Sequence, residues 1–120
     1  MIPPHWPCHR RHEDDEILGY LRPVDDSPGR FVPVTLLGHP LGDPSEEEHA
    51  RRRLDRTGLG YLAQDWLLSL PGHPEPIAVQ IVEVTPRQVR LKNVDYGYPD
   101  AAIGHVFVLD VPLAGQLRPR

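Results

Sequence analysis

The chain has one cysteine, Cys8, among its 120 residues, and no long apolar run. A single cysteine excludes an intramolecular disulfide, which fits a reducing compartment. No segment approaches the roughly 18 consecutive apolar residues of a membrane-spanning helix. The first residues also lack the apolar core of a signal peptide. We therefore expect a soluble, cytoplasmic protein with no membrane partner.

The sequence also lacks a basic excess. Lysine and arginine together number 13 against 17 acidic residues, which gives a formal net charge of -4. This balance argues against a protein that binds duplex nucleic acid, since such proteins normally carry strong positive charge. The basic residues are arginines apart from Lys92. We interpret that bias as a mark of GC-rich coding and expect a bacterial source.

Catalytic and cofactor motifs are missing as well. The chain has no G-x-S-x-G nucleophile elbow and no phosphate-binding loop. Residues 58–63 match G-x-G-x-x-A in letters. However, we expect a helix before them and a strand after them, the reverse of the order that dinucleotide binding requires. The sequence therefore predicts no cofactor.

Proline and glycine are abundant, at 15 and 10 residues. They favour many short elements joined by turns over long helices. The length suits one domain, which we place at residues 15–112. Residues 1–14 are rich in proline, histidine and charge and are expected to be a disordered tail. Residues 113–120 are expected to form a C-terminal tail.

Residues 76–94 predict a hairpin of two short strands. Ile77, Val79 and Ile81 alternate with smaller or polar residues, the period of a half-buried strand. The apolar phase slips by one residue at Val82, which indicates a β-bulge and a bent strand. After a turn at residues 85–87 the alternation resumes. Bent hairpins of this kind build curled sheets and partly closed barrels.

The remaining elements complete a mostly β (α+β) fold. We predict a curled antiparallel sheet or partly open β-barrel of about six short strands. A helix at residues 46–57 covers an open end or edge, with Ser45 and Glu48 as its capping box. The last strand, residues 104–111, is apolar on both faces and is expected to be central. The predicted core comprises Leu18, Tyr20, Val32, Val34, Leu54, Trp66, Leu68, Val79, Ile81, Val89, Leu91, Phe107 and Leu109.

The tail contains residue types that zinc accepts, at His5, Cys8, His9 and His12. A structural zinc site normally organises the fold around it, and this proline-rich segment has no rigid frame. We therefore interpret these residues as an incidental cluster and predict no metal site.

Three kinds of function remain open. A small enzyme would place an acid–base site near Glu83, His105 and Asp110. Small barrels of the SH3-like, Sm-like and OB kinds often bind nucleic acid, and this possibility would use Arg87, Arg90, Lys92 and the tyrosines Tyr96 and Tyr98.

We favour a non-catalytic protein-interaction or accessory binding module. No catalytic set of residues is assembled in the sequence, and exposed aromatic residues make good interface anchors. A protein partner is expected, with binding residues Glu83, Arg90, Lys92, Tyr96, Tyr98 and His105.

Overall fold

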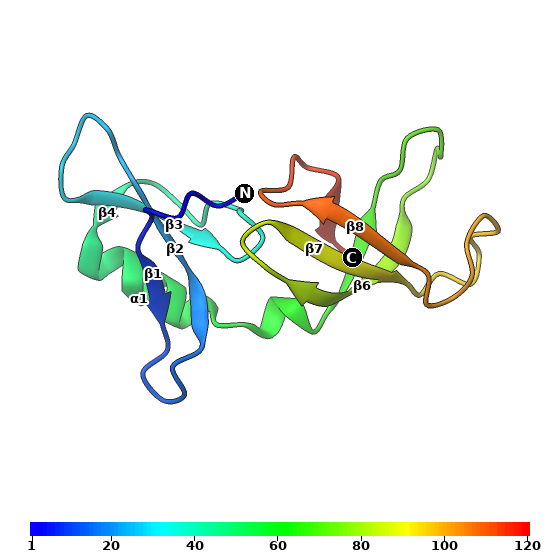
Figure 1. Cartoon of the computed structure of the whole chain (residues 1–120), viewed down its shortest axis with the longest axis horizontal. Helices are drawn as coiled ribbons and strands as arrows, with labels where there is room; N and C mark the ends of the chain where they lie inside the picture. The colour runs from blue at the N-terminus through cyan, green and yellow to red at the C-terminus, as the bar shows by residue number, and fades with distance from the viewer. The chain divides into compact units, whose positions relative to one another are not determined.

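The computed structural model describes residues 1–120, which divide into two compact units. One unit comprises residues 2–59, and the other comprises residues 60–120 together with Met1. Each unit contains one antiparallel sheet, and the chain has a single α-helix (Figure 1). The expected mostly β fold with one helix is confirmed. None of the helices is long and apolar enough to cross a membrane.

The unit of residues 2–59 is built on a four-stranded sheet in the order β1-β2-β3-β4. The central hairpin, β2–β3, closes through the turn at residues 25–29, where Gly29 has a φ of 83°. That conformation favours glycine. The strands are β1 (Cys8–Arg10), β2 (Ile17–Pro23), β3 (Arg30–Thr35) and β4 (Ser45–Glu46).

The helix α1 (Glu47–Thr57) packs on β2 and β3 through a narrow apolar stripe. Ala50 and Leu54 are buried against Leu18 and Leu21, with Phe31, Leu41 and Leu59 at the margin of this cluster. The helix ends where predicted, because Gly58 takes a φ of 61° and donates its N–H to the Leu54 carbonyl at 2.9 Å.

The predicted capping box at the start of α1 does not form. Glu46 is the N-cap residue, and its side chain makes no capping hydrogen bond. The Ser45 hydroxyl instead lies near the Glu46 carbonyl oxygen, at 3.4 Å. The reason is that Ser45 and Glu46 pair with β3 as strand β4, which holds Ser45 outside the first helical turn.

The unit of residues 60–120 contains a five-stranded sheet in the order β8-β7-β6-β5-β9. Strands β5 to β8 form a meander, and β9 then pairs with the free side of β5. The elements are the short 3₁₀ helix η1 (Gly60–Leu62) and the strands β5 (Asp65–Leu68), β6 (Ile77–Val84), β7 (Gln88–Asn93), β8 (Val106–Asp110) and β9 (Leu117–Pro119).

The bulge predicted from the phase slip is confirmed in the β6–β7 hairpin. Ile81 lies opposite Leu91 and Glu83 lies opposite Arg90, so Val82 is the extra residue of the bulge. Its side chain is 55% exposed. The hairpin turn is held by Thr85, whose hydroxyl oxygen accepts the N–H of Gln88 at 3.0 Å.

The predicted core is mostly buried. Three of its members, Ile81, Phe107 and Leu109, are only half-buried. Phe107 and Leu109 lie on β8 at the edge of the sheet, and Ile81 lies at the bulge, beyond the residues of β6 that pair with β5. Buried residues outside the predicted core set include Leu21, Leu37, Ala50, Ile77, Asn93, Val111, Leu113 and Leu117.

The chain ends differ from the expected tails. Strand β1 lies within residues 1–14 and pairs with β2, with Cys8 opposite Tyr20. Strand β9 lies within residues 113–120 and places the buried Leu117 opposite Leu68. Short strands of this kind depend on a partner strand far away in the sequence, and local composition does not reveal that partner.

Candidate interaction surface

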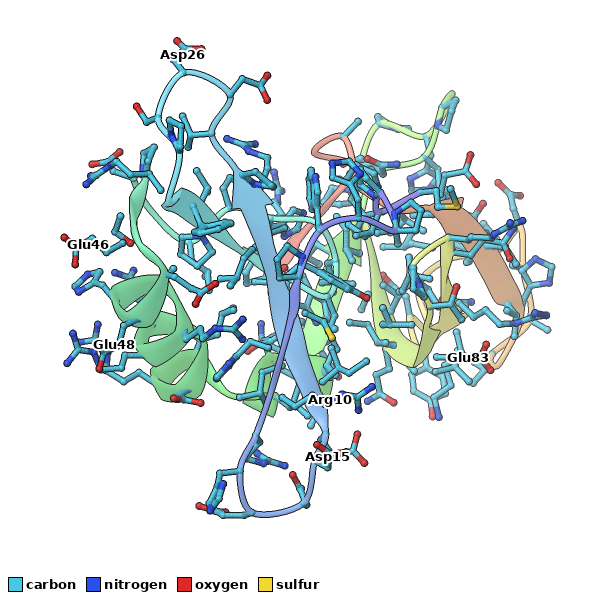
Figure 2. The ribbon with its side chains drawn as sticks, turned by 60° about the vertical axis from the view of Figure 1, so that its left-hand side comes forward. Arg10, Asp15, Asp26, Glu46, Glu48 and Glu83 are labelled. Atoms are coloured by element: carbon cyan, nitrogen blue, oxygen red, sulfur yellow. The ribbon has the colours of Figure 1, made fainter.

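The predicted binding residues are spread over one sheet face and one loop. Glu83 on β6 and Arg90 and Lys92 on β7 are exposed, and Figure 2 labels Glu83 on the outside of the molecule. The aromatic residues Tyr96, Tyr98 and His105 belong to the connection between β7 and β8.

The exposed face of the five-stranded sheet consists of cross-strand rows. In one row, Lys92 lies between Val106 on β8 and Gln80 on β6. This row continues to Asp65, which accepts a hydrogen bond from the Gln80 amide at 2.8 Å and pairs with Arg120 at 3.1 Å. The result is a face of mixed charge that carries apolar side chains at its β8 end.

A second row on this face runs through Arg90. Its neighbours are Val108 on β8 and Glu83 on β6. Val106 and Val108 are 41% and 45% exposed. Because side chains opposite each other on adjacent strands share a face, both valines lie on the same face as Lys92 and Arg90. The two valines therefore lie on the outer face, next to the cationic side chains of β7.

Strand β8 is at the edge of its sheet, which corrects the expectation of a central strand. That expectation rested on the apolar character of both faces. The backbone pairing shows which groups are free. His105 accepts the N–H of Asn93, and Val111 donates to Arg87, both toward β7. Because antiparallel pairing alternates, the N–H and C=O groups of Val106, Val108 and Asp110 point away from β7.

The other sheet edges are protected, in contrast to β8. β4 has two residues, and β1 has three residues with a register shift. β9 has three residues and contains Arg118 and Pro119. Natural proteins protect sheet edges with short strands, irregular pairing, charge and proline. β8 has five residues, no proline and no charge before Asp110. It is the one edge that can accept another strand over its length.

A small cavity of about 120 Å³ lies between the loops at residues 70–76 and 95–98. It is lined in part by His73, Asp95 and Tyr98, and the rings of His73 and Tyr98 meet edge to face at 4.9 Å. Ligand pockets usually have volumes of about 300–1,000 Å³. Glu83, His105 and Asp110 do not line this cavity. The structure therefore does not bring the predicted acid–base residues together in it.

The polar groups of this cavity already have hydrogen-bond partners. Asp95 accepts the N–H of Ala78 at 3.1 Å and the N–H of Gly97 at 2.9 Å. These two bonds lower the pKa of the Asp95 carboxyl below its usual 3.8. His73 Nδ1 bonds to the carbonyl oxygen of Glu75. These hydrogen bonds order the two loops.

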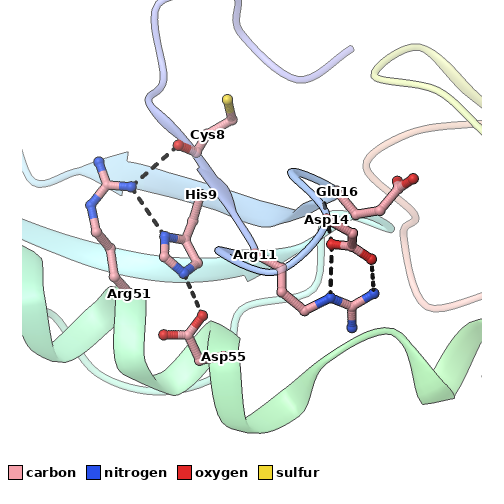
Figure 3. Close-up of polar contacts among 7 residues, drawn as sticks. All are labelled: Cys8, His9, Arg11, Asp14, Glu16, Arg51 and Asp55. Carbon is pink, nitrogen blue, oxygen red and sulfur yellow. Dashed lines mark hydrogen bonds and ion pairs between the residues drawn. The ribbon is translucent and has the colours of Figure 1, made fainter.

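A histidine–carboxylate pair joins β1 to α1 in the other unit. His9 Nε2 lies 2.7 Å from Asp55 Oδ1, and Arg51 Nη1 lies 3.2 Å from His9 Nδ1 (Figure 3). A guanidinium can only donate, so Nδ1 accepts and Nε2 carries the proton that bonds Asp55. Both ring nitrogens are therefore occupied, and the arrangement connects a strand to a helix without leaving a free base.

His9 belongs to the group of zinc-accepting residue types at His5, Cys8, His9 and His12, which the sequence led us to interpret as incidental. No group of three or more histidine, cysteine and acidic side chains has a geometry that could hold a metal ion. In the turn after β1, Arg11 binds both oxygens of Asp14, at 3.0 and 2.7 Å (Figure 3). Hydrogen bonds from Arg11 and from the N–H of Glu16 lower the pKa of Asp14. This segment is ordered by ion pairs.

The exposed side of α1 has a shallow hollow of about 380 Å³, lined by His49, Arg52, Asp55 and Arg56. Among the arginines of α1, Arg51 pairs with Glu47 at 3.7 Å. Acidic side chains stand among the guanidinium groups here. This is not the continuous positive surface that a phosphate backbone selects.

No family model, no curated protein and no solved structure matches this chain. The candidate surface therefore rests on its own geometry. Sequence reasoning identified Arg90 and Lys92 but missed Val106 and Val108. Knowing the pairing register of β7 and β8 would have identified the two valines, since this register places Val108 opposite Arg90 and Val106 opposite Lys92.

Proposed function

We propose that the chain is a non-catalytic protein-interaction module that binds an extended segment of a protein partner by adding it as a strand to the edge of β8. The observation that carries the proposal is the unprotected apolar edge of β8. Strand addition derives affinity from the free main-chain groups and specificity from alternate side chains.

The side chains around the edge define the chemistry of the partner. Val106 and Val108 offer apolar contact on the outer face, and Arg90 and Lys92 lie one strand further in. An incoming strand with alternating apolar and acidic residues matches this surface, because its acidic side chains reach toward the cations over the small valines. The acidic residues Glu83 and Asp65 on the same face favour such a protein segment over a nucleic acid.

A synthetic peptide of alternating valine and aspartate, with blocked ends, tests this function. We expect amide NMR shifts on the full chain that concentrate at Val106, Val108 and Asp110, with binding that weakens as salt rises. Val108→Pro should abolish binding, because it removes an edge N–H that β7 does not use. Val82→Lys, on the same sheet but away from the edge, is the matched control and should bind normally.

Two results would overturn the proposal. One is a set of shifts confined to α1 or to the loops at residues 70–76 and 95–100. The other is binding that Val108→Pro leaves intact. A single-stranded oligonucleotide is tested in parallel, and tighter binding of the oligonucleotide, lost on Arg90→Glu, would favour a nucleic-acid function instead.

A further inference from the structure

The free edge of β8 is complementary to itself. When two copies of the strand run antiparallel with Val108 opposite Val108, Val106 of each copy lies opposite Asp110 of the other. All these residues direct their N–H and C=O groups away from β7, as the alternation in the β7–β8 ladder shows. In this register each facing pair exchanges its hydrogen bonds, and no free group of the edge lacks a partner.

The side chains agree with the same register. Val106 and Val108 of both copies form one apolar strip on the outer face, and Phe107 of each copy lies opposite Leu109 of the other on the inner face. Phe107 and Leu109 are only half-buried in the single chain. An added strand therefore covers the apolar residues that the sheet leaves incompletely covered.

Charge complementarity supports a second copy as the occupant of this edge. Neither Lys92 nor Asp110 takes part in an ion pair within the chain. Lys92 lies opposite Val106 on one side. In the self-paired register, Asp110 of the second copy lies opposite Val106 on the other side. The long lysine side chain can cross the valine to reach that carboxylate, and the symmetry of the pair makes this contact twice.

We propose that β8 pairs with β8 of a second copy of this chain in that register, and that this forms a dimer with a continuous sheet across the interface. The inference rests on the proposed use of the β8 edge and names the occupant of that edge. Pairing uses up the free edge of both copies, so the assembly stops at the dimer. One strand on each side makes a small interface, and the dimer is accordingly weak and dependent on concentration.

Sedimentation velocity of the full chain over a range from micromolar to millimolar concentration tests this inference. We expect a shift from monomer to dimer that Val108→Pro abolishes and that the control Val82→Lys leaves unchanged. Lys92→Glu should weaken dimerisation at least tenfold at low salt. The combined variant Lys92→Glu with Asp110→Lys should restore it, because the pair is reversed and remains complementary.

The outcomes separate this inference from the proposed function. A chain that stays monomeric at every concentration, yet binds the valine–aspartate peptide at β8, overturns the dimer and leaves the function standing. Failure of both self-association and peptide binding overturns both. Growth beyond the dimer, or a dimer that Val108→Pro does not affect, contradicts the self-paired register. Circular dichroism of each variant establishes that the fold is retained.

Discussion

Asn93 and Asp95 show how single side chains order the loop between β7 and β8. Asn93 is fully buried, and its amide donates to the carbonyl oxygens of Ala101 and Ala102, each at 3.2 Å. Its side-chain oxygen accepts the N–H of Asp95 at 2.9 Å. A buried amide with all these partners costs little in the fold, whereas a buried amide without them would be expensive. The loop that leads into β8 is therefore fixed by its own polar residues.

The acid stability of the protein depends in part on Asp95. The N–H groups of Ala78 and Gly97 hold its pKa below 3.8, so the carboxylate stabilises the folded state above that pH. This contribution is lost as the pH falls through the lowered pKa. We expect Asp95→Asn to flatten the fall in the free energy of unfolding between about pH 5 and about pH 2, measured by urea titration.

A matched control for this experiment lies in the same loop. Asp100→Asn removes the charge of an exposed carboxylate and reports the general effect of one negative charge. If the free energy of unfolding fell equally at acid pH in Asp95→Asn and in the unmodified chain, the two backbone hydrogen bonds to Asp95 would contribute nothing to folding.

At the scale of elements, the sequence predicted what depends on local patterns and failed where distant pairing decides. The helix expected at residues 46–57 corresponds to α1, and the bulge at Val82 follows from the phase slip in the apolar pattern. The capping box failed because β4 pairs Ser45 with Phe31, a residue that the local motif does not include. Likewise, β8 was expected to be central, since an apolar strand gives no sign of which neighbour it lacks.

The contact of α1 with its sheet depends on a glycine in β2. A Cβ atom added to Gly19 would lie 2.4 Å from the Val34 carbonyl oxygen and 2.7 Å from Leu54 Cδ2. The backbone oxygen cannot move without disturbing the β2–β3 ladder. We expect Gly19→Ala to lower the free energy of unfolding by about 3 kcal/mol, measured by denaturant titration.

Gly60→Ala is the control for this substitution. Gly60 has no atom within 4 Å of its added Cβ and lacks the positive φ that would itself cause strain. Its replacement should change the free energy of unfolding by less than about 0.5 kcal/mol. Equal effects of the two substitutions would show that the close approach of α1 and β2 does not limit stability.

At the scale of the whole molecule, the sequence predicted the fold class but not the division into two units. One domain was expected from the length of the chain. The structure instead places a separate sheet and core on each side of residue 60. Gly58 follows the end of α1, and Gly60 begins η1 at this boundary. However, no composition change marks it, because both halves are β-rich and bury similar apolar residues.

This division predicts that residues 60–120 fold without residues 2–59. All five strands of the second sheet lie in this segment, and its core includes Trp66, Leu68 and Leu91. A domain of about 60 residues buries only about 60% of the surface of its unfolded chain, so we expect low but cooperative stability. A cooperative thermal transition in circular dichroism, together with a dispersed amide NMR spectrum, would show that residues 60–120 fold on their own.

The same segment should retain the self-association of the full chain, since Lys92, Val106, Val108 and Asp110 all belong to it. A shorter piece that ends in the β6–β7 turn lacks β7, β8 and β9, and should be unfolded. If residues 60–120 were disordered while the full chain is folded, the two units would depend on each other for stability. If they fold but remain monomeric where the full chain dimerises, residues outside the β8 edge must carry the contact.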